Sequence, residues 1–149
     1  MNDNLTRLET IAAARIDRRV SARQAAELIR DAGSYRWVGL YDVTATEIVA
    51  IAWTGSAAPA FPTFPVTQGL NGAAVAAREP IVIQDVTQDP RYLTTFGGTR
   101  AEAIFPVAAR EGGPIVGTID VESDRPNSFT PDDERFLRSC AKALAPLWR

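Results

Sequence analysis

The sequence contains no histidine and a single cysteine, Cys140. Without histidine the chain cannot build a His-ligated zinc or haem site, a Ser-His-Asp triad or a Cys-His pair. One cysteine cannot form an internal disulfide, and this fits a reducing cytoplasm. Any general acid or base must therefore be Asp, Glu, Lys, Tyr or Cys.

The chain also lacks long apolar runs and a dominant charge sign. No run approaches transmembrane length, and the first ten residues lack the basic start and apolar segment of a signal peptide. Sixteen basic and 18 acidic residues leave a net charge of −2, which does not indicate an electrostatic nucleic-acid binder. We therefore expect a cytoplasmic protein that binds neither nucleic acid nor membranes.

What the sequence does contain suits one folded unit: 149 residues, 46% of them hydrophobic. A chain of this size buries roughly 70% of the surface that its unfolded form exposes. Residues 1–20 are expected to form an N-terminal amphipathic helix, with residues 21–149 as the main domain. The helix stripe recurs at three- and four-residue spacing; its members are Leu5, Leu8, Ala12, Ile16 and Val20. Ser21 with Gln24 three residues later predicts a capping box that starts a second helix.

The middle of the chain alternates between strand and loop patterns. Residues 35–43 and 47–53 are rich in β-branched and aromatic residues and predict a β-hairpin. Residues 55–65 contain three prolines and predict an extended, strand-poor loop. Asn71 is expected to cap a helix that runs from about Gly72 to Arg78.

The last third predicts paired strands and a final helix. Residues 81–86 are expected to form a short strand, and Asp89 to cap a helical turn. Residues 102–109 and 113–122 predict a second pair of strands, and Thr130 caps a closing helix. Helices at both chain ends around these strands indicate one α/β sandwich with an antiparallel sheet.

Several motifs occur in the order found in GAF domains, and the chain resembles this family over residues 20–148. The motifs are WVGLY (37–41), GLNGAAVA (69–76), IQDVTQDPRY (83–92), AEAIFPV (101–107), GTIDVES (117–123) and FTPDDERFL (129–137). The resemblance implies an α+β fold with a central antiparallel sheet. It also implies N- and C-terminal helices on one face, a ligand pocket on the other, and small-molecule sensing.

Within this family the chain is most similar to the stand-alone free methionine-R-sulfoxide reductases. The cysteines of that branch would fall here near Phe61, on Asn71 and around Thr94 or Thr95, and none of these is cysteine. Sulfoxide reduction needs a thiolate nucleophile and a resolving thiol. We therefore expect a non-catalytic sensor with no catalytic residue, cofactor or metal. An enzyme with a non-standard site and a dimerisation module with a vestigial pocket are the alternatives.

Three acidic residues are the strongest candidates for a binding site. In a strand over residues 115–123, Asp120 and Glu122 share one face. A three-residue turn at 111–113 places Glu102 opposite Glu122, as the GAF pattern implies, whereas a two-residue turn reverses the face. Opposed carboxylates repel, so a dry site needs raised pKa values or a cation. That cation would be a ligand ammonium group, Arg100 or another internal base, or Mg²⁺ or Ca²⁺. A solvated strand end with an ion pair is the alternative.

Other candidates surround the acids. The amides that begin the helix after Asn71 would suit a ligand carboxylate or phosphate, unless Asn71 simply caps them. Tyr41 and Trp53 would form an apolar wall or plain core, and Asp85 would bond its own turn. The expected ligand-binding residues are Tyr41, Trp53, Asn71, Asp85, Thr95, Glu102, Asp120 and Glu122. The expected ligand is an amino acid, amine or nucleotide, and the expected assembly is a homodimer through the terminal helices.

Overall fold

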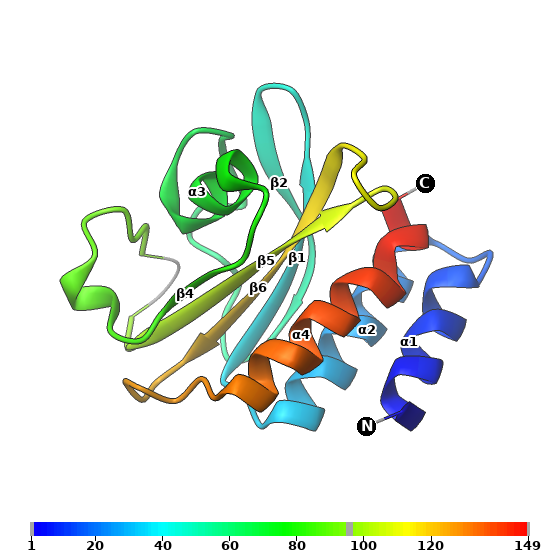
Figure 1. Ribbon diagram of the computed structural model, residues 1–149, viewed down its shortest axis with the longest axis horizontal. Coiled ribbons are helices and arrows are strands. Elements are labelled where there is room, and N and C mark those ends of the chain that lie inside the picture. Colours follow the sequence, from blue (N-terminus) through cyan, green and yellow to red (C-terminus); the bar gives the residue numbers. More distant parts are fainter. Residues whose placement is uncertain (1, 95–96, 149) are drawn as a thin grey trace.

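The computed structural model describes residues 2–94 and 97–148. A six-stranded sheet in the order β3-β2-β1-β6-β5-β4, antiparallel throughout, separates two layers of helices (Figure 1). Helices α1 (Asn2–Ala13), α2 (Arg18–Gly33) and α4 (Pro131–Leu144) cover one face, and α3 (Gly69–Ala77) covers part of the other. The strands are β1 (Trp37–Val43), β2 (Glu47–Thr54), β3 (Thr63–Pro65), β4 (Ile81–Ile83), β5 (Ala101–Ala108) and β6 (Ile115–Ser123), and two 3₁₀ turns are η1 (Val86–Gln88) and η2 (Ala145–Trp148). The expected sandwich is confirmed.

The main core lies between the sheet and the three-helix layer. Helices α1, α2 and α4 and strand β6 each contribute fully buried side chains to this core. Examples are Leu8, Ile29, Leu137 and Ile119. In β6 the side chains alternate as predicted, so Ile119 and Val121 face the helices. This leaves the neighbouring residues of the same strand on the opposite face, where the site lies.

The predicted first helix is wrong at its end. Helix α1 stops at Ala13, and α2 begins at Arg18 instead of Ser21. Asp17 caps α2 by accepting the Arg19 N–H, so Ser21 lies buried inside the helix. The two helices are separate, so Ile16 and Val20 do not continue the buried stripe of α1. Their exposed fractions are 53% and 48%.

The capping prediction for Asn71 is also wrong, and this matters for the site. Helix α3 starts at Gly69, and its cap residue Gln68 makes no side-chain cap bond. Gly69 has φ 72°, a backbone conformation that suits glycine. Asn71 therefore sits in the first turn of α3, with its amide free to bond another element.

The β5–β6 hairpin has the predicted register with a different turn. The Gly113 N–H donates to the Arg110 carbonyl at 2.8 Å, which closes a turn with two central residues. Such a turn alone would put Glu102 and Glu122 out of register. However, Ala108 pairs with Ile115 and Val107 with Gly117, so a bulge restores the register. Glu102 lies opposite Glu122 as expected.

Smaller differences concern the loops. The proline-rich segment contributes strand β3, which pairs with β2 at the sheet edge. The helical turn after β4 is capped by Asp85, whereas Asp89 accepts the Arg91 N–H. The closing helix has the predicted Thr130 cap. Across residues 2–94 and 97–148, none of the helices combines the length and apolar character that a membrane crossing requires.

Candidate functional site

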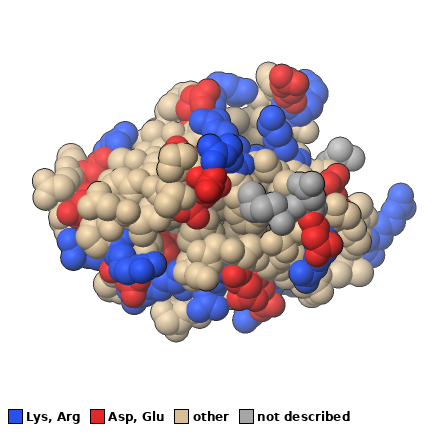
Figure 2. Space-filling model, turned by 60° about the horizontal axis from the view of Figure 1, so that its bottom comes forward, with Lys and Arg blue, Asp and Glu red and all other residues tan. Residues whose placement is uncertain are grey.

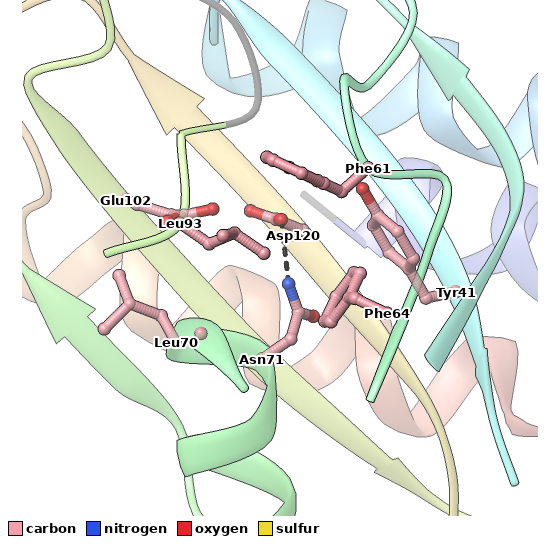
Figure 3. Close-up of a pocket in the computed structure, with 9 residues that line it drawn as sticks. Tyr41, Phe61, Phe64, Leu70, Asn71, Leu93, Glu102 and Asp120 are labelled. Carbon is pink, nitrogen blue, oxygen red and sulfur yellow. Dashed lines mark hydrogen bonds between the residues drawn. The ribbon is translucent and has the colours of Figure 1, made fainter. Parts of the chain in front are cut away.

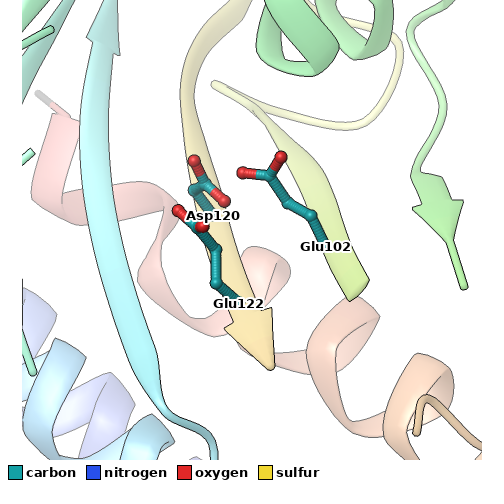
Figure 4. Close-up of side chains that lie close together, drawn as sticks. All are labelled: Glu102, Asp120 and Glu122. Carbon is teal, nitrogen blue, oxygen red and sulfur yellow. The ribbon is translucent and has the colours of Figure 1, made fainter. Parts of the chain in front are cut away.

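Three acids gather on the side of the sheet that faces away from α1, α2 and α4. Glu102 comes from β5, and Asp120 and Glu122 come from β6 (Figure 4). Their exposed fractions are 3%, 1% and 0%, and carboxylate oxygens of the three lie within 4.8 Å of one another. The predicted grouping is therefore present and dry, which excludes the solvated strand end.

Neighbouring polar groups fix the acids in place. The Asn71 side-chain amide donates to Asp120 Oδ2 at 3.0 Å (Figure 3). Thr118 Oγ1 donates to Asn71 Oδ1 at 2.6 Å. Thr99 Oγ1 donates to Glu122 Oε1 at 2.6 Å. Asp120 Oδ1 is buried and accepts no hydrogen bond within the described part of the chain. The acids are thus held in position, with one oxygen available for another group.

No ion pair between described residues neutralises Glu102 or Asp120. Arg100, one predicted partner, instead lies 3.7 Å from Asp85. Burial, followed by the charges of Asp120 and Glu122, raises the pKa of Glu102 well above its usual range. Burial also raises the pKa of Asp120, against hydrogen bonds from Glu102 and Asn71. The upward direction of both pKa shifts favours one proton shared by Glu102 and Asp120 over two adjacent negative charges.

A small, partly enclosed cavity adjoins the acids (Figure 3). Its volume is about 10 Å³, which is about what one water molecule needs. The lining residues are Tyr41, Phe61, Phe64, Gly69, Leu70, Asn71, Leu93, Glu102 and Asp120. The expectation of a hollow large enough for an amino acid is wrong for this conformation. Phe61 and Leu93, from two loops, take up the space.

A larger open groove lies on the other side of Leu93. It has a volume of about 650 Å³ and runs between α3 and residues 90–93. Gly69 and Leu93 line both the groove and the small cavity. The groove and the cavity next to the acids therefore meet at these two residues.

The remaining predicted residues divide into two groups. Tyr41 lines the cavity, and burial next to the acids raises the pKa of its hydroxyl. Trp53 packs in the aromatic cluster of β1 and β2 but does not line the cavity. Asp85 accepts the Thr87 N–H in its own turn, as the alternative proposed, and lies outside the cavity. Thr95 lies outside the described residues.

Sequence reasoning missed several residues of the site. Thr118 shares a strand face with Asp120, as the two-residue period predicts, but it was not chosen as a site residue. Leu93 comes from an irregular loop, where no periodicity indicates which way a side chain points. Phe61 lies in another such loop, and only its match to a cysteine position of the reductases had placed it near the site. Tyr92 was also missed, and burial raises the pKa of its hydroxyl to about 12.

The only cysteine is remote from this site. Cys140 lies on α4 within the helix-side core and is fully buried. Burial raises the pKa of its thiol to about 12, so the reactive thiolate is suppressed. The sheet separates it from the acids, as expected from its place on the apolar face of the last helix.

Comparison with protein families assigns the chain. A family model described as GAF domain matches residues 17–146. The chain belongs to the GAF domain family. GAF domain-containing protein A of Dictyostelium discoideum is 28% identical over 117 residues, covering 78% of this chain and 72% of that protein. The free methionine-R-sulfoxide reductase of Saccharomyces cerevisiae is 26% identical over 111 residues, covering 72% of this chain and 60% of the enzyme.

Solved structures agree with this assignment. The type II free methionine-R-sulfoxide reductase from Thermoplasma acidophilum has a TM-score of 0.80 and 29% identity, with 94% of each chain covered. The free methionine-R-sulfoxide reductase from Neisseria meningitidis, in complex with its substrate, has a TM-score of 0.85 and 25% identity, with 99% of this GAF chain and 87% of that chain covered. The fold class and the predicted relationship to this branch are both confirmed.

Charged side chains of one sign do not dominate the face drawn in Figure 2. Basic and acidic side chains are interspersed there, with broad uncharged areas between them. This pattern matches the small net charge of −2.

Proposed function

We propose that this GAF domain is a non-catalytic small-molecule sensor whose ligand presents a cationic group to Glu102, Asp120 and Glu122. The observation that carries the proposal is the burial of three carboxylates within 4.8 Å of one another, without an ion pair to Glu102 or Asp120. A buried negative cluster is unfavourable unless a cation or protons offset it. A ligand ammonium group supplies that charge and three donors.

The surroundings of the acids favour a free amino acid or a small amine. Tyr41, Phe64 and Leu70 form an apolar wall next to the carboxylates. The first turn of α3 also lines the cavity, and its cap residue makes no side-chain bond. Its amides can therefore receive a ligand carboxylate, while the acids receive the ammonium group. The names of the reductase relatives, which act on a free amino acid derivative, support a ligand of this size.

Ligand entry requires the cover of the cavity to move. About 10 Å³ cannot hold an amino acid, so Phe61 and Leu93 must swing outward. Movement of Leu93 would join the cavity to the neighbouring groove of about 650 Å³. A ligand that holds these loops in a new position would change the surface that a partner protein reads, which is how a sensor without its own catalytic site can signal.

Overall similarity to the reductases favours the enzyme alternative, but the absence of the cysteines that the reaction needs argues against it. The chain has no cysteine at the three places expected for that branch, and Asn71 bonds Asp120 instead. Cys140 is buried on the far side of the sheet. Turnover of free methionine-R-sulfoxide with a dithiol reductant, unchanged in Cys140→Ser, would favour the enzyme over the sensor.

Thermal-shift and calorimetric titration with free amino acids, amines and nucleotides test the proposal, with EDTA present to remove metal ions. We expect stabilisation by at least one amine or amino acid, and at least tenfold weaker binding in Glu102→Gln. Glu111→Gln, an exposed acid on the same hairpin, is the matched control and should bind normally. No response to any amine or amino acid would reject the proposal.

A further inference from the structure

A separate open groove lies between α4, the β5–β6 hairpin and the turn that joins α3 to β4. Its volume is about 560 Å³. None of the three clustered acids lines it. We propose that this groove binds an acidic peptide segment of a partner protein.

The charged side chains around the groove are mostly basic. Four basic residues against two acidic ones give its rim a net charge of +2, whereas the whole chain carries −2. All six side chains are exposed, so an approaching partner can reach them. The basic residues are Arg78, Arg110, Arg138 and Lys142, and the acidic ones are Glu79 and Glu111. The complementary partner surface is therefore negative.

The basic groups keep donors for a partner. Arg78 donates to the Gly113 carbonyl, which holds its guanidinium beside the hairpin turn and leaves its other N–H groups available. Arg138 lies 3.7 Å from an acid of the rim, and both side chains are more than half exposed. No ion pair joins Arg110 or Lys142 to another residue in 2–94 or 97–148. Carboxylates of a partner can therefore pair with these groups without breaking a buried interaction.

The basic groups also come from three different elements. Arg78 ends α3, Arg110 belongs to the β5–β6 turn, and Arg138 and Lys142 project from α4. The positive charge is thus distributed around an open groove instead of converging on one point. Several carboxylates spaced along a peptide match this distribution better than one compact phosphate group.

The floor of the groove is apolar and follows an open sheet edge. Ala141 of α4 and Phe105 and Pro106 of β5 contribute to it. Strand β4 pairs with β5 only up to Ile104, so no strand of the described chain lies beside residues 105–108 on that edge. An extended peptide can lie there, with apolar side chains on the floor and alternating acids at the rim. The proline has no N–H to donate, so side-chain contacts must supply most of the binding.

Phage-displayed random peptides, selected on the full chain, test this inference without a known partner. We expect the selected peptides to combine Asp or Glu with apolar residues. Synthetic copies should bind in fluorescence anisotropy measurements, and their affinity should fall as the salt concentration rises. Selected peptides without an excess of acidic residues would overturn the inference.

Two double variants with the same change in net charge locate the binding. Arg110→Gln with Lys142→Gln should weaken binding of the acidic peptides about tenfold or more. Arg15→Gln with Arg125→Gln changes exposed residues that do not line the groove, and it should change the affinity by less than about twofold. An equal loss in both double variants would show general charge attraction and would overturn the inference.

Lys142 is the only lysine in the sequence and gives a second readout. A carbodiimide that joins carboxylates to amines should cross-link the acidic peptides to Lys142, as mass spectrometry would show. Lys142→Arg keeps the charge, so it should bind the peptides without this cross-link. A cross-link confined to the N-terminal amine would overturn the inference. Binding of ATP or inorganic phosphate at Arg110 and Lys142, with no acidic peptide selected, would also overturn it. None of these measurements uses an amine or amino acid, so the groove and the proposed sensor function can fail independently.

Discussion

Replacing Glu102 by glutamine should make the ligand-free protein more stable at neutral pH. The substitution keeps the shape of the side chain and removes one of three carboxyl groups whose oxygens lie within 4.8 Å. Burial and the neighbouring acids raise the pKa of Glu102 well above the ordinary value of 4.5. The wild-type site must therefore either hold a proton against its normal acidity or accept charge repulsion.

Both routes have a similar free-energy cost. With an effective dielectric constant of about 20, two carboxylates at this separation repel by about 3.5 kcal/mol. Holding one proton at about pH 7.5, roughly three units above its ordinary pKa, costs about 4 kcal/mol. The glutamine side chain avoids this free-energy cost, but part of the gain is lost because its amide does not reproduce every hydrogen bond of the carboxyl group. We expect a net gain of about 2 kcal/mol, which is about 4–8 °C in melting temperature for a domain of this size.

The pH dependence has a definite sign. Between the unfolded and folded pKa values of Glu102, the folded state holds a proton that the unfolded state has released. Wild-type stability must therefore fall as pH rises above about 4.5, and the advantage of Glu102→Gln must grow in the same direction. Below that pH both states are protonated and the two proteins should be about equally stable.

Urea unfolding of wild type and Glu102→Gln in EDTA, at several values from about pH 4.5 to about pH 8, measures this effect. Glu111→Gln is the control and should change stability by less than about 0.5 kcal/mol at each pH. A Glu102→Gln protein that is less stable than wild type at about pH 7.5 would refute the reasoning. A difference that does not vary with pH would do the same.

Four other experiments test separate parts of the structure. Asn71→Ala should lower the free energy of unfolding by about 1–3 kcal/mol in urea titrations, because Asp120 and Thr118 lose a buried partner. Cys140 should resist iodoacetamide in the folded protein and react in denaturant, because burial raises its thiol pKa to about 12; rapid native labelling would contradict this. Phe61→Ala and Leu93→Ala should each speed ligand association in stopped-flow measurements, and unchanged rates would show that these side chains are not the cover. We also propose a homodimer through the terminal helices, and Ile16→Glu with Val20→Glu should shift it to monomer in sedimentation experiments.

Much of the fold follows from local patterns in the sequence. The alternation in β6 places Ile119 and Val121 toward the helices, and this leaves Asp120 and Glu122 on the other face. Thr130 and Pro131 mark the start of α4 because both act through backbone groups next to them in the chain. These signals need no knowledge of distant residues.

The errors concern positions where tertiary contacts or competing local signals decide. Asn71 is a good cap in isolation, but its hydrogen bonds to β6 place it inside the first turn of α3. Asp17 and Ser21 are both good cap residues, and the sequence does not show which one the packing of α2 selects. The size of the cavity depends on how Phe61 and Leu93 pack, and no periodic pattern describes loops.

The most direct test of the sensor proposal is a crystal structure with an amine or amino acid that stabilises the protein in EDTA. The account predicts the ligand nitrogen within hydrogen-bond distance, about 3 Å, of Asp120 Oδ1, with Phe61 and Leu93 displaced. A ligand bound elsewhere, with the acids still enclosed beneath both side chains, would contradict it.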